Sequence, residues 1–210
     1  MSQTETAGTQ PRDFTRRTFI KGVIATGATA SSAGYLFKGT SLLGAATYQT
    51  ATERLITLNV NGQERRVDVL PHETLAMTLR YKLGLTGTKL GCDRAECGAC
   101  TILVDGVSQY GCSMLTHQVR GREVTTIEGL ENPDTGALSP VQQAVMEEGG
   151  FQCAFCAPGF IMSMTAMLDE NPNPTREEAA EALAGNLCRC ADYDKILTCA
   201  MRAAELTRSV

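Results

Sequence analysis

The nine cysteines constrain this chain more than any other feature of its sequence. Eight of them fall into two groups of four with the spacings C-x4-C-x2-C-x11-C and C-x2-C-x31-C-x1-C, and Cys199 stands apart. In order, the groups are Cys92, Cys97, Cys100 and Cys112, then Cys153, Cys156, Cys188 and Cys190. Tryptophan is absent and only 5% of the residues are aromatic, and a small core of this kind often needs covalent or metal staples. The cysteines are therefore the first candidates for what holds the fold together.

The opening C-x4-C-x2-C of the first group is the plant-type spacing for a [2Fe–2S] cluster. We therefore expect each group to bind one such cluster, with disulfides and zinc as the alternatives. A zinc ribbon expects two C-x2-C pairs about 15–20 residues apart, and neither group has that form. Disulfides would have to use Cys188 and Cys190, which are awkwardly close neighbours. Cys199 lies among apolar residues of a predicted helix, where a buried, inert thiol is expected.

The surroundings of the first group predict a small sheet crossed by one helix. Residues 74–83 have helical spacing, while Asn61-Gly62 and Asp105-Gly106 are strong hairpin signals. Alternating or apolar segments predict strands at residues 54–60, 65–70, 101–104, from 107 onward, and 123–127. Gly91 and Gly98 remove Cβ atoms where the backbone must approach a cluster closely. This pattern indicates a ferredoxin-like β-grasp.

The second group lies in a helical context. Two capping boxes, Ser139 to Gln142 and Thr175 to Glu178, start helices. A further apolar helix is predicted from about residue 158 to residue 168, where its N-terminal dipole favours nearby thiolates. Asp192 can cap a last helix that runs to about Leu206. Two helix pairs would thus bring both cysteine pairs to one end of a bundle.

These patterns predict an α+β chain with two folded domains. The first is a plant-type [2Fe–2S] ferredoxin domain at residues 51–129, and the second is a four-helix [2Fe–2S]-binding domain at residues 137–207. Residues 1–46 are predicted to be a twin-arginine signal segment, because Arg16 and Arg17 precede Phe19 and a weakly apolar stretch. That stretch is too short and too weakly apolar for a membrane span, which needs about 20 apolar residues.

The export signal bears on the chemistry of the cysteines. Small residues end the segment, and cleavage near Thr47 is expected; retention as an uncleaved anchor and a chance arginine pair are the alternatives. Twin-arginine export carries folded, cofactor-loaded proteins, which fits metal centres assembled before export. We therefore expect a periplasmic protein without an integral span, with association at the outer face of the inner membrane left open.

Charge and the remaining residues exclude several function classes. Beyond residue 46 the chain has 14 basic and 21 acidic side chains, so no basic stripe exists for nucleic acid. His72 and His117 are the only histidines, and neither lies in a nucleophile–base constellation. We find no phosphate-binding motif, no G-x-S-x-G and no catalytic residue, so the chain is predicted to have no substrate pocket of its own.

Four motifs give the sequence a resemblance to a known family. From about residue 54 to 206 it resembles the small subunits of the xanthine oxidase family of molybdenum hydroxylases, and its twin-arginine start is most similar to periplasmic aldehyde oxidoreductases. The motifs are Gly91-Cys92 through Cys97-Gly98-Ala99-Cys100, Thr126 to Leu130, Gln152-Cys153-Ala154-Phe155-Cys156-Ala157-Pro158-Gly159, and Gly185-Asn186-Leu187-Cys188-Arg189-Cys190. The chain departs from the family pattern at Ala95, Ala154, Ala157 and Ala191-Asp192, and none of these changes removes a ligand.

The resemblance implies roles for particular residues. The cluster of the helical domain would lie nearer the molybdenum cofactor, and the plant-type cluster would be the next step toward the acceptor. Gln152 would contact the pterin, and Cys190, besides holding iron, would approach it too. Arg189 would pair with the cofactor or the partner, or be a solvated arginine. The molybdopterin-type cofactor itself would be held by a large partner subunit.

The resemblance also implies the function. The chain would be the electron-transfer subunit of an exported molybdenum hydroxylase, with hydroxylation carried out on the large subunit and a flavin or c-type cytochrome subunit, or a soluble carrier, as acceptor. We expect an aldehyde substrate, and N-heterocycles of the isoquinoline, nicotinate or purine type are the alternative. Carbon monoxide ranks third. A free-standing electron carrier and a disulfide-stapled binding protein are the competing classes.

Overall fold

The computed structural model describes residue 17, residues 19–22, residue 24 and residues 54–209. The chain divides into two compact units, Met1–Gln49 and Thr50–Val210. The described residues of the first unit are helical, whereas Arg16 and the predicted cleavage site lie outside the described residues. Within the described ranges, no helix is long and apolar enough to cross a membrane.

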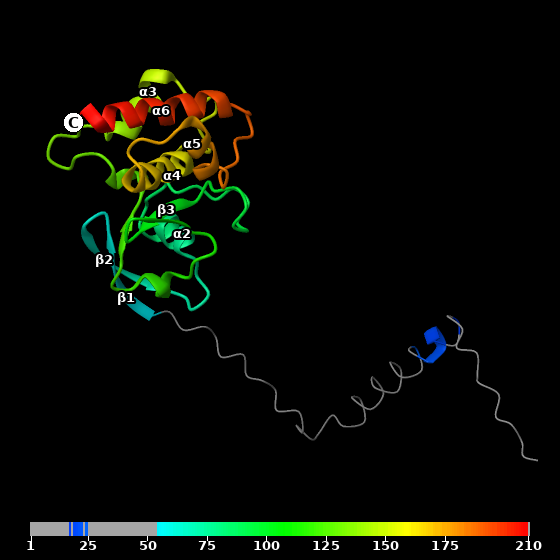
Figure 1. Ribbon diagram of the computed structural model, residues 1–210. Coiled ribbons are helices and arrows are strands. Elements are labelled where there is room, and N and C mark those ends of the chain that lie inside the picture. The colour runs from blue at the N-terminus through cyan, green and yellow to red at the C-terminus, as the bar shows by residue number, and fades with distance from the viewer. Residues whose placement is uncertain (1–16, 18, 23, 25–53, 210) are drawn as a thin grey trace, which may run out of the picture. The chain divides into compact units, whose positions relative to one another are not determined.

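A five-stranded sheet forms the first half of the second unit (Figure 1). Its strands are β1 (Arg54–Val60), β2 (Gln63–Val69), β3 (Thr101–Val104), β4 (Val107–Tyr110) and β5 (Glu123–Thr125). The order across the sheet is β2-β1-β5-β3-β4. β1 and β5 are parallel, and the other neighbouring pairs are antiparallel. Both predicted hairpins are present, and the turn of the first uses positive φ at Asn61 and Gly62 (53° and 71°), which suits a two-residue turn between twisted strands.

One helical segment packs on this sheet, as predicted, but its geometry changes part-way. It begins as α2 (Leu75–Met77), capped by the Thr74 hydroxyl, and continues as the π-helix η1 (Thr78–Lys82). The N–H of Leu83 bonds to the carbonyl of Thr78, five residues earlier. Leu75 and Leu79 are fully buried with the apolar face of the sheet. Two short 3-10 turns, η2 (Thr116–Val119) and η3 (Ile127–Gly129), complete this half.

Four helices form the other half of the unit. They are α3 (Pro140–Glu148), α4 (Ala157–Glu170), α5 (Arg176–Ala182) and α6 (Tyr193–Ser209). Both predicted capping boxes are formed, at Ser139 with Gln142 and at Thr175 with Glu178. Helices α3 and α6 pack along each other (Figure 1). Their core is built mostly from α4 and α6 and includes the buried side chains of Phe160, Met164 and Ile196.

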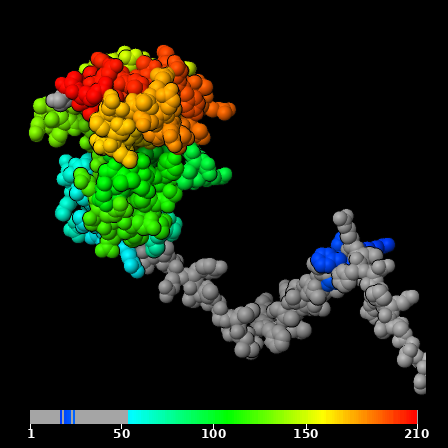
Figure 2. Space-filling view, in the orientation of Figure 1, coloured from blue at the N-terminus to red at the C-terminus, as the bar shows by residue number. Residues whose placement is uncertain are grey.

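The two halves are packed directly on each other. In Figure 1, α4 lies next to β3, and the two elements are in contact. Figure 2 shows the helical half, coloured yellow to red, in direct contact with the green surface of the sheet half. All four residues of β3 are buried, since Ile102 and Val104 join the core of the sheet while α4 covers the strand. The predicted α+β architecture is confirmed.

Candidate metal centres

The β3–β4 hairpin places two cysteines of the first group side by side. Cys100 directly precedes β3, and Cys112 lies two positions after the end of β4. Because Thr101 pairs with Tyr110 in the hairpin, the two cysteines extend the same ladder, and the N–H of Gly111 bonds to the carbonyl of Cys100 at 3.1 Å. Both thiols are buried. Local hairpin register thus decides half of this site.

The loop that precedes β3 directs five backbone N–H groups at sulfur atoms. Asp93 and Ala95 have positive φ (53° and 58°), which turns successive N–H groups toward one side of the loop. The N–H groups of Arg94, Glu96 and Cys97 donate to Sγ of Cys92 at 3.4 Å each, that of Cys92 donates to Sγ of Cys97 at 3.4 Å, and that of Ala95 donates to Sγ of Cys112 at 3.3 Å. Such donors stabilise thiolates and help set the potential of an iron–sulfur cluster.

The pKa values of these thiols are spread widely. Burial raises the pKa of Cys92, but the three N–H groups directed at its sulfur outweigh burial and lower the pKa to about 7. Burial, with a smaller contribution from the neighbouring sulfurs of Cys112 and Cys97, raises the pKa of Cys100 to about 12. A thiol in that setting ionises only when a cation takes the place of its proton. Neighbouring thiols in this setting therefore suit a metal centre.

The second group is assembled from two helix ends. Cys156 is the residue before α4, and Cys188 and Cys190 lie in the loop between α5 and α6. Burial and, to a smaller extent, the nearby thiol of Cys188 together raise the pKa of Cys156 to about 12. Cys153 is exposed, and the N–H of Phe155 is the main cause of its lowered pKa, followed by a hydrogen bond from the thiol of Cys190. The group therefore spans from the protein interior to the surface.

Each group divides into two pairs of neighbouring sulfurs. The pairs are Cys92 with Cys97, Cys100 with Cys112, Cys153 with Cys190, and Cys156 with Cys188. All nine cysteines are free thiols, and nowhere in the described ranges are three or more His, Cys, Asp or Glu side chains grouped to hold one metal ion. A [2Fe–2S] cluster has two irons and takes four thiolates, two to each iron. Paired sulfurs fit that cluster better than they fit a disulfide or a single zinc ion.

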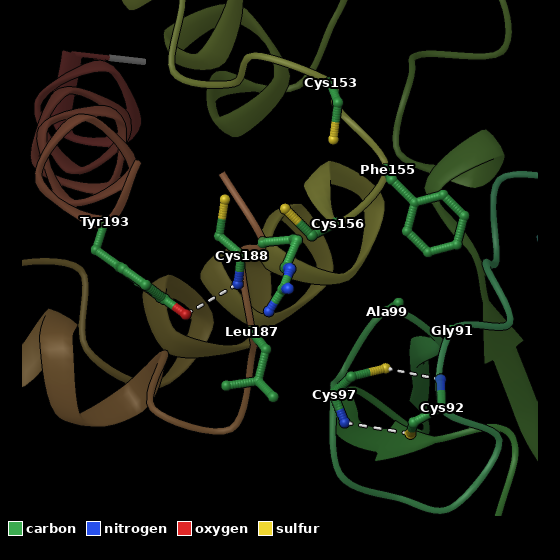
Figure 3. Close-up of a pocket in the computed structure, with 11 residues that line it drawn as sticks. Gly91, Cys92, Cys97, Ala99, Cys153, Phe155, Cys156, Leu187, Cys188 and Tyr193 are labelled. Atoms are coloured by element: carbon green, nitrogen blue, oxygen red, sulfur yellow. Dashed lines mark hydrogen bonds between the residues drawn. The ribbon is translucent and has the colours of Figure 1, made fainter. Parts of the chain in front are cut away.

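A pocket of about 390 Å³ joins the two groups. Figure 3 shows the sulfurs of Cys153, Cys156 and Cys188 directed toward one another, with Cys92 and Cys97 in the neighbouring loop. The rest of the lining comes from Gly91, Ala99, Phe155, Leu187, Arg189 and Tyr193. A Cβ atom at Gly91 would lie 3.0 Å from Sγ of Cys97. The close approach that we expected at this glycine is therefore present.

Hydrogen bonds fasten the two cysteine loops together. The N–H of Leu187 donates to the carbonyl of Cys97 at 2.9 Å, and Nδ2 of Asn186 donates to the carbonyl of Gly98 at 3.1 Å. The hydroxyl of Ser163 donates to Oδ1 of Asn186 at 2.8 Å. Gly98 has a φ of 68°, and a Cβ atom on it would lie 2.5 Å from Nδ2 of Asn186. The buried Asn186 therefore fixes the distance between the two sites.

The remaining predicted residues have clear positions. Gln152 is exposed and donates from Nε2 to Oδ1 of Asp192 at 2.8 Å. The carboxylate of Asp192 does not cap α6 as we expected, because it accepts this bond instead. Cys199 is fully buried, in keeping with an inert thiol. His72 is exposed and His117 half-buried, and neither lines the pocket between the cysteine groups.

Comparison with known proteins identifies the two halves. The family described as "2Fe-2S iron-sulfur cluster binding domain" matches residues 58–124, and that described as "[2Fe-2S] binding domain" matches residues 126–201. The nicotine 6-hydroxylase small subunit of Paenarthrobacter nicotinovorans is 49% identical over 148 residues, which cover 70% of this chain and 88% of that protein. The chain belongs to the iron–sulfur small subunits of the xanthine oxidase family of molybdenum hydroxylases. It is a redox subunit, and the catalytic site of such enzymes lies on the large subunit.

Other family members extend this likeness. The aldehyde oxidoreductase iron-sulfur-binding subunit PaoA of Escherichia coli (strain K12) is 38% identical over 214 residues, covering 93% of this chain and 91% of that protein. The crystal structure of quinoline 2-oxidoreductase from Pseudomonas putida 86 matches with a TM-score of 0.71 and 37% identity, over 76% of this chain and 98% of that chain. The family therefore includes proteins named for aldehydes and proteins named for N-heterocycles.

Sequence reasoning missed three polar contributors to the site. Asn186 was visible only as part of a motif, because its partners lie up to 88 positions away. The hydroxyl of Tyr193 accepts from the N–H of Cys188 at 3.0 Å (Figure 3). The bond between Gln152 and Asp192 spans 40 positions. The contacts of Asn186 and the bond between Gln152 and Asp192 join residues too far apart for any local spacing rule. Tyr193 is only five positions from Cys188, but no helix or turn spacing singles it out.

Proposed function

We propose that this chain carries electrons from a molybdenum site on a large partner subunit to an acceptor, using two [2Fe–2S] clusters. The observation that carries the proposal is the division of both cysteine groups into sulfur pairs, together with a shared pocket that cysteines of both groups line. The cysteines that line this pocket are Cys92, Cys97, Cys153, Cys156 and Cys188. One cluster would be held by Cys92, Cys97, Cys100 and Cys112, and the other by Cys153, Cys156, Cys188 and Cys190. When bound, such clusters supply one-electron transfer at potentials that the protein tunes.

The residues of the chain set the conditions for that chemistry. The N–H groups of the loop before β3 are directed at Cys92, Cys97 and Cys112, where they would stabilise negative charge on the sulfurs. Buried positions at Cys100 and Cys156 would keep water from the inner edge of each site. The bonds from Asn186 and Leu187 hold the two sites at a constant separation, which electron transfer through a protein requires.

We place the molybdenum partner at the helical group and the acceptor at the sheet group. Gln152 and Cys153 are exposed, so a partner can reach the helical site, where Gln152 and Cys190 would contact the molybdopterin cofactor. At the other site, Asp93, Arg94 and Glu96 are exposed on the cysteine loop and offer a second approach. A flavin or c-type cytochrome subunit is the acceptor that we propose there.

An aldehyde is the substrate that we propose for the complete enzyme, with a carboxylic acid as product. The support is the extent of the match to the E. coli aldehyde oxidoreductase subunit. It covers 93% of this chain, more than residues 54–210 contain, so it extends into the N-terminal segment. An N-heterocycle is the second candidate, favoured by the 49% identity to the nicotine 6-hydroxylase subunit.

We further propose that the complex is exported through the twin-arginine route and works in the periplasm. The support is the order of Arg16, Arg17 and Phe19 before a weakly apolar stretch. The double variant R16K/R17K should keep the chain in the cytoplasm with its N-terminus intact. The wild-type chain should appear in the periplasmic fraction, shortened to a start near Thr47. If the wild-type chain and R16K/R17K were divided in the same way between cytoplasm and periplasm, export by this route would be refuted.

The complex purified through this chain tests the central proposal. Reduction with dithionite should give two distinct [2Fe–2S] EPR signals and about four irons per chain, with a molybdenum subunit that co-purifies. An aromatic aldehyde should then be oxidised faster than nicotinate or isoquinoline with a dye as acceptor. A single EPR signal would support a free-standing carrier instead, and an iron-free preparation with disulfides would support a stapled binding protein.

A further inference from the structure

Gln152 and Asp192 form a pair at the exposed edge of the helical site. Gln152 directly precedes Cys153, and Asp192 lies two positions after Cys190. Those two cysteines have neighbouring sulfurs. Nε2 of Gln152 donates to Oδ1 of Asp192 at 2.8 Å. The pair therefore lies beside the sulfurs nearest the surface.

This contact fixes which end of the Gln152 amide faces outward. An ionised carboxylate can only accept hydrogen bonds, so the amide nitrogen, which can only donate, must face Asp192. The amide oxygen Oε1 is then turned away, and Gln152 is an exposed residue. No group in the part of the chain that the structure describes donates to Oε1. The chain thus presents a hydrogen-bond acceptor at this edge.

The carboxylate of Asp192 contacts Gln152 and does not cap helix α6. An aspartate just before a helix normally accepts from N–H groups of the first turn, but its carboxylate makes no such bond to α6. Its other oxygen, Oδ2, is buried and has no partner among the described residues. An unpartnered buried carboxylate oxygen is costly. The side chain is therefore placed for Gln152 at some expense to the stability of the helix.

The charge of Asp192 also acts on the cysteine site. Asp192 lies two positions after the ligand Cys190, and its carboxylate is hydrogen-bonded to the residue that directly precedes the ligand Cys153. A negative charge close to a ligand sulfur makes the addition of an electron less favourable. Asp192 should therefore lower the reduction potential of a cluster held there.

We propose that Asp192 is a positioning residue that holds the Gln152 amide with its oxygen outward, so that the chain recognises the molybdenum cofactor through an N–H group of the pterin. The inference rests on the proposed function, in which Gln152 meets that cofactor. A pterin carries both N–H donors and ring acceptors, and an amide that was free to rotate could bind either. The fixed amide selects the donor edge.

Four variants of the native complex test this proposal. D192N keeps the size of the side chain but can offer either a donor or an acceptor to Gln152. Q152A removes the amide, and the double variant combines both changes. D194N is the matched control, because Asp194 is also at the start of α6 but pairs with Arg176 and is 94% exposed. The readouts are the molybdenum and pterin retained per complex after extensive buffer exchange, and the EPR midpoint potential of the helical cluster.

D192N should retain about threefold to tenfold less cofactor, the range for one misplaced hydrogen bond. Q152A should show a similar loss, and the double variant should lose no more than Q152A, because both changes affect one contact. The midpoint potential should shift to a more positive value in D192N and stay unchanged in D194N. Both EPR signals should persist in every variant, which shows that the fold is intact.

The possible failures are distinguishable. A wild-type complex without molybdenum or pterin would overturn the proposed function, and with it this inference. A loaded wild-type complex in which D192N retains cofactor normally, or in which the two losses add, would overturn the role of Asp192 alone. An unchanged midpoint potential in D192N would overturn its electrostatic effect on the cluster.

Discussion

At the scale of single residues, a few positions are decided by close contacts at the junction of the two cysteine loops. Gly98 is the clearest case, because its backbone has positive φ and its missing Cβ leaves room for Asn186 and for the carbonyl of Gly185. Gly106 also has positive φ but has open space around it. The two glycines therefore separate the cost of backbone strain from the cost of a steric clash.

G98A should be much more destabilising than G106A. Both changes carry the cost of a left-handed backbone, about 1–2 kcal/mol, but an alanine at Gly98 would also displace Asn186, which adds about 1–3 kcal/mol. Urea unfolding of the two variants measures the difference, and iron content checks the site. Equal losses of stability would show that the contact with Asn186 is unimportant.

Glu73 is a second residue whose surroundings predict a measurable effect. It is buried and pairs with Lys82 at 2.8 Å, while the hydroxyl of Thr78 donates to it at 2.7 Å. Burial raises the pKa of Glu73, but Lys82, Thr78 and the N–H of Leu70 outweigh burial and lower the pKa below its ordinary value. Its ionised form is therefore the form that stabilises the fold.

This lowered pKa predicts a pH dependence with a definite sign. The stabilisation by Glu73 is complete above its ordinary pKa of 4.5 and is lost as pH falls through the lower pKa of the folded state. E73Q should cost about 1–2 kcal/mol at pH 7, and its deficit should shrink below about pH 4.5. Thermal unfolding of the wild type and of E73Q at each pH measures the deficit. Acid also removes the clusters, but it does so in both proteins, so the difference between them still reports on Glu73. A constant deficit would contradict the prediction.

At the scale of elements, short local signals decided where helices begin. The capping boxes at Ser139 and Thr175 were visible in the sequence and are formed in the structure. The switch from α-helix to π-helix after Met77 was not visible, because it depends on how the segment packs on the sheet. Helix starts are set by the residues at the cap, whereas helix geometry also depends on distant neighbours.

S139A and T175A should each destabilise the chain by about 1 kcal/mol. The two losses should add, because the caps begin different helices, α3 and α5, and share no partner. T198A, on the exposed face of α6, is the control and should change stability by less than about 0.5 kcal/mol. Denaturant unfolding followed by far-UV circular dichroism measures the wild type, the two single cap variants, the double variant S139A/T175A and T198A. If S139A or T175A lost no more stability than T198A, the capping box at that position would not stabilise its helix.

At the scale of the whole molecule, the sheet half and the helical half are joined by polar contacts that reach between the cysteine loops. The hydroxyl of Tyr110 donates to the carbonyl of Gly185 at 2.8 Å, close to the bond from Asn186 to Gly98. Helix α4 adds its contact with β3. These contacts predict that the two halves unfold together.

N186A should weaken this coupling. It removes the bond from Asn186 to the carbonyl of Gly98, which keeps its bonds from Thr101. It also leaves the buried hydroxyl of Ser163 without the acceptor Oδ1 of Asn186, and the two losses together cost about 2–3 kcal/mol. In the wild type, visible circular dichroism of the clusters and the helical signal at 222 nm should change together, and in N186A the two transitions should separate. N173A, at an exposed asparagine, should behave like the wild type. Coincident transitions in N186A would mean that α4 alone couples the halves.

Much of this protein could be predicted from its sequence, because many of its signals act over short distances along the chain. The cysteine spacings, the Asn61-Gly62 turn and the helix caps each involve residues within a few positions of one another, and the family motifs followed from them. The backbone conformation and the hydrogen bonds of a turn or a helix cap depend little on the rest of the chain.

Only the tertiary structure decided how those parts meet. The pairing of Cys153 with Cys190, the bond from Asn186 to Gly98 and the contact between Gln152 and Asp192 join residues 37, 88 and 40 positions apart. Such contacts depend on the packing of α4 and α6 against the sheet, which is a property of all the core residues together. For the same reason Asp192, which the sequence predicts to be a helix cap, instead orients a glutamine beside the helical site.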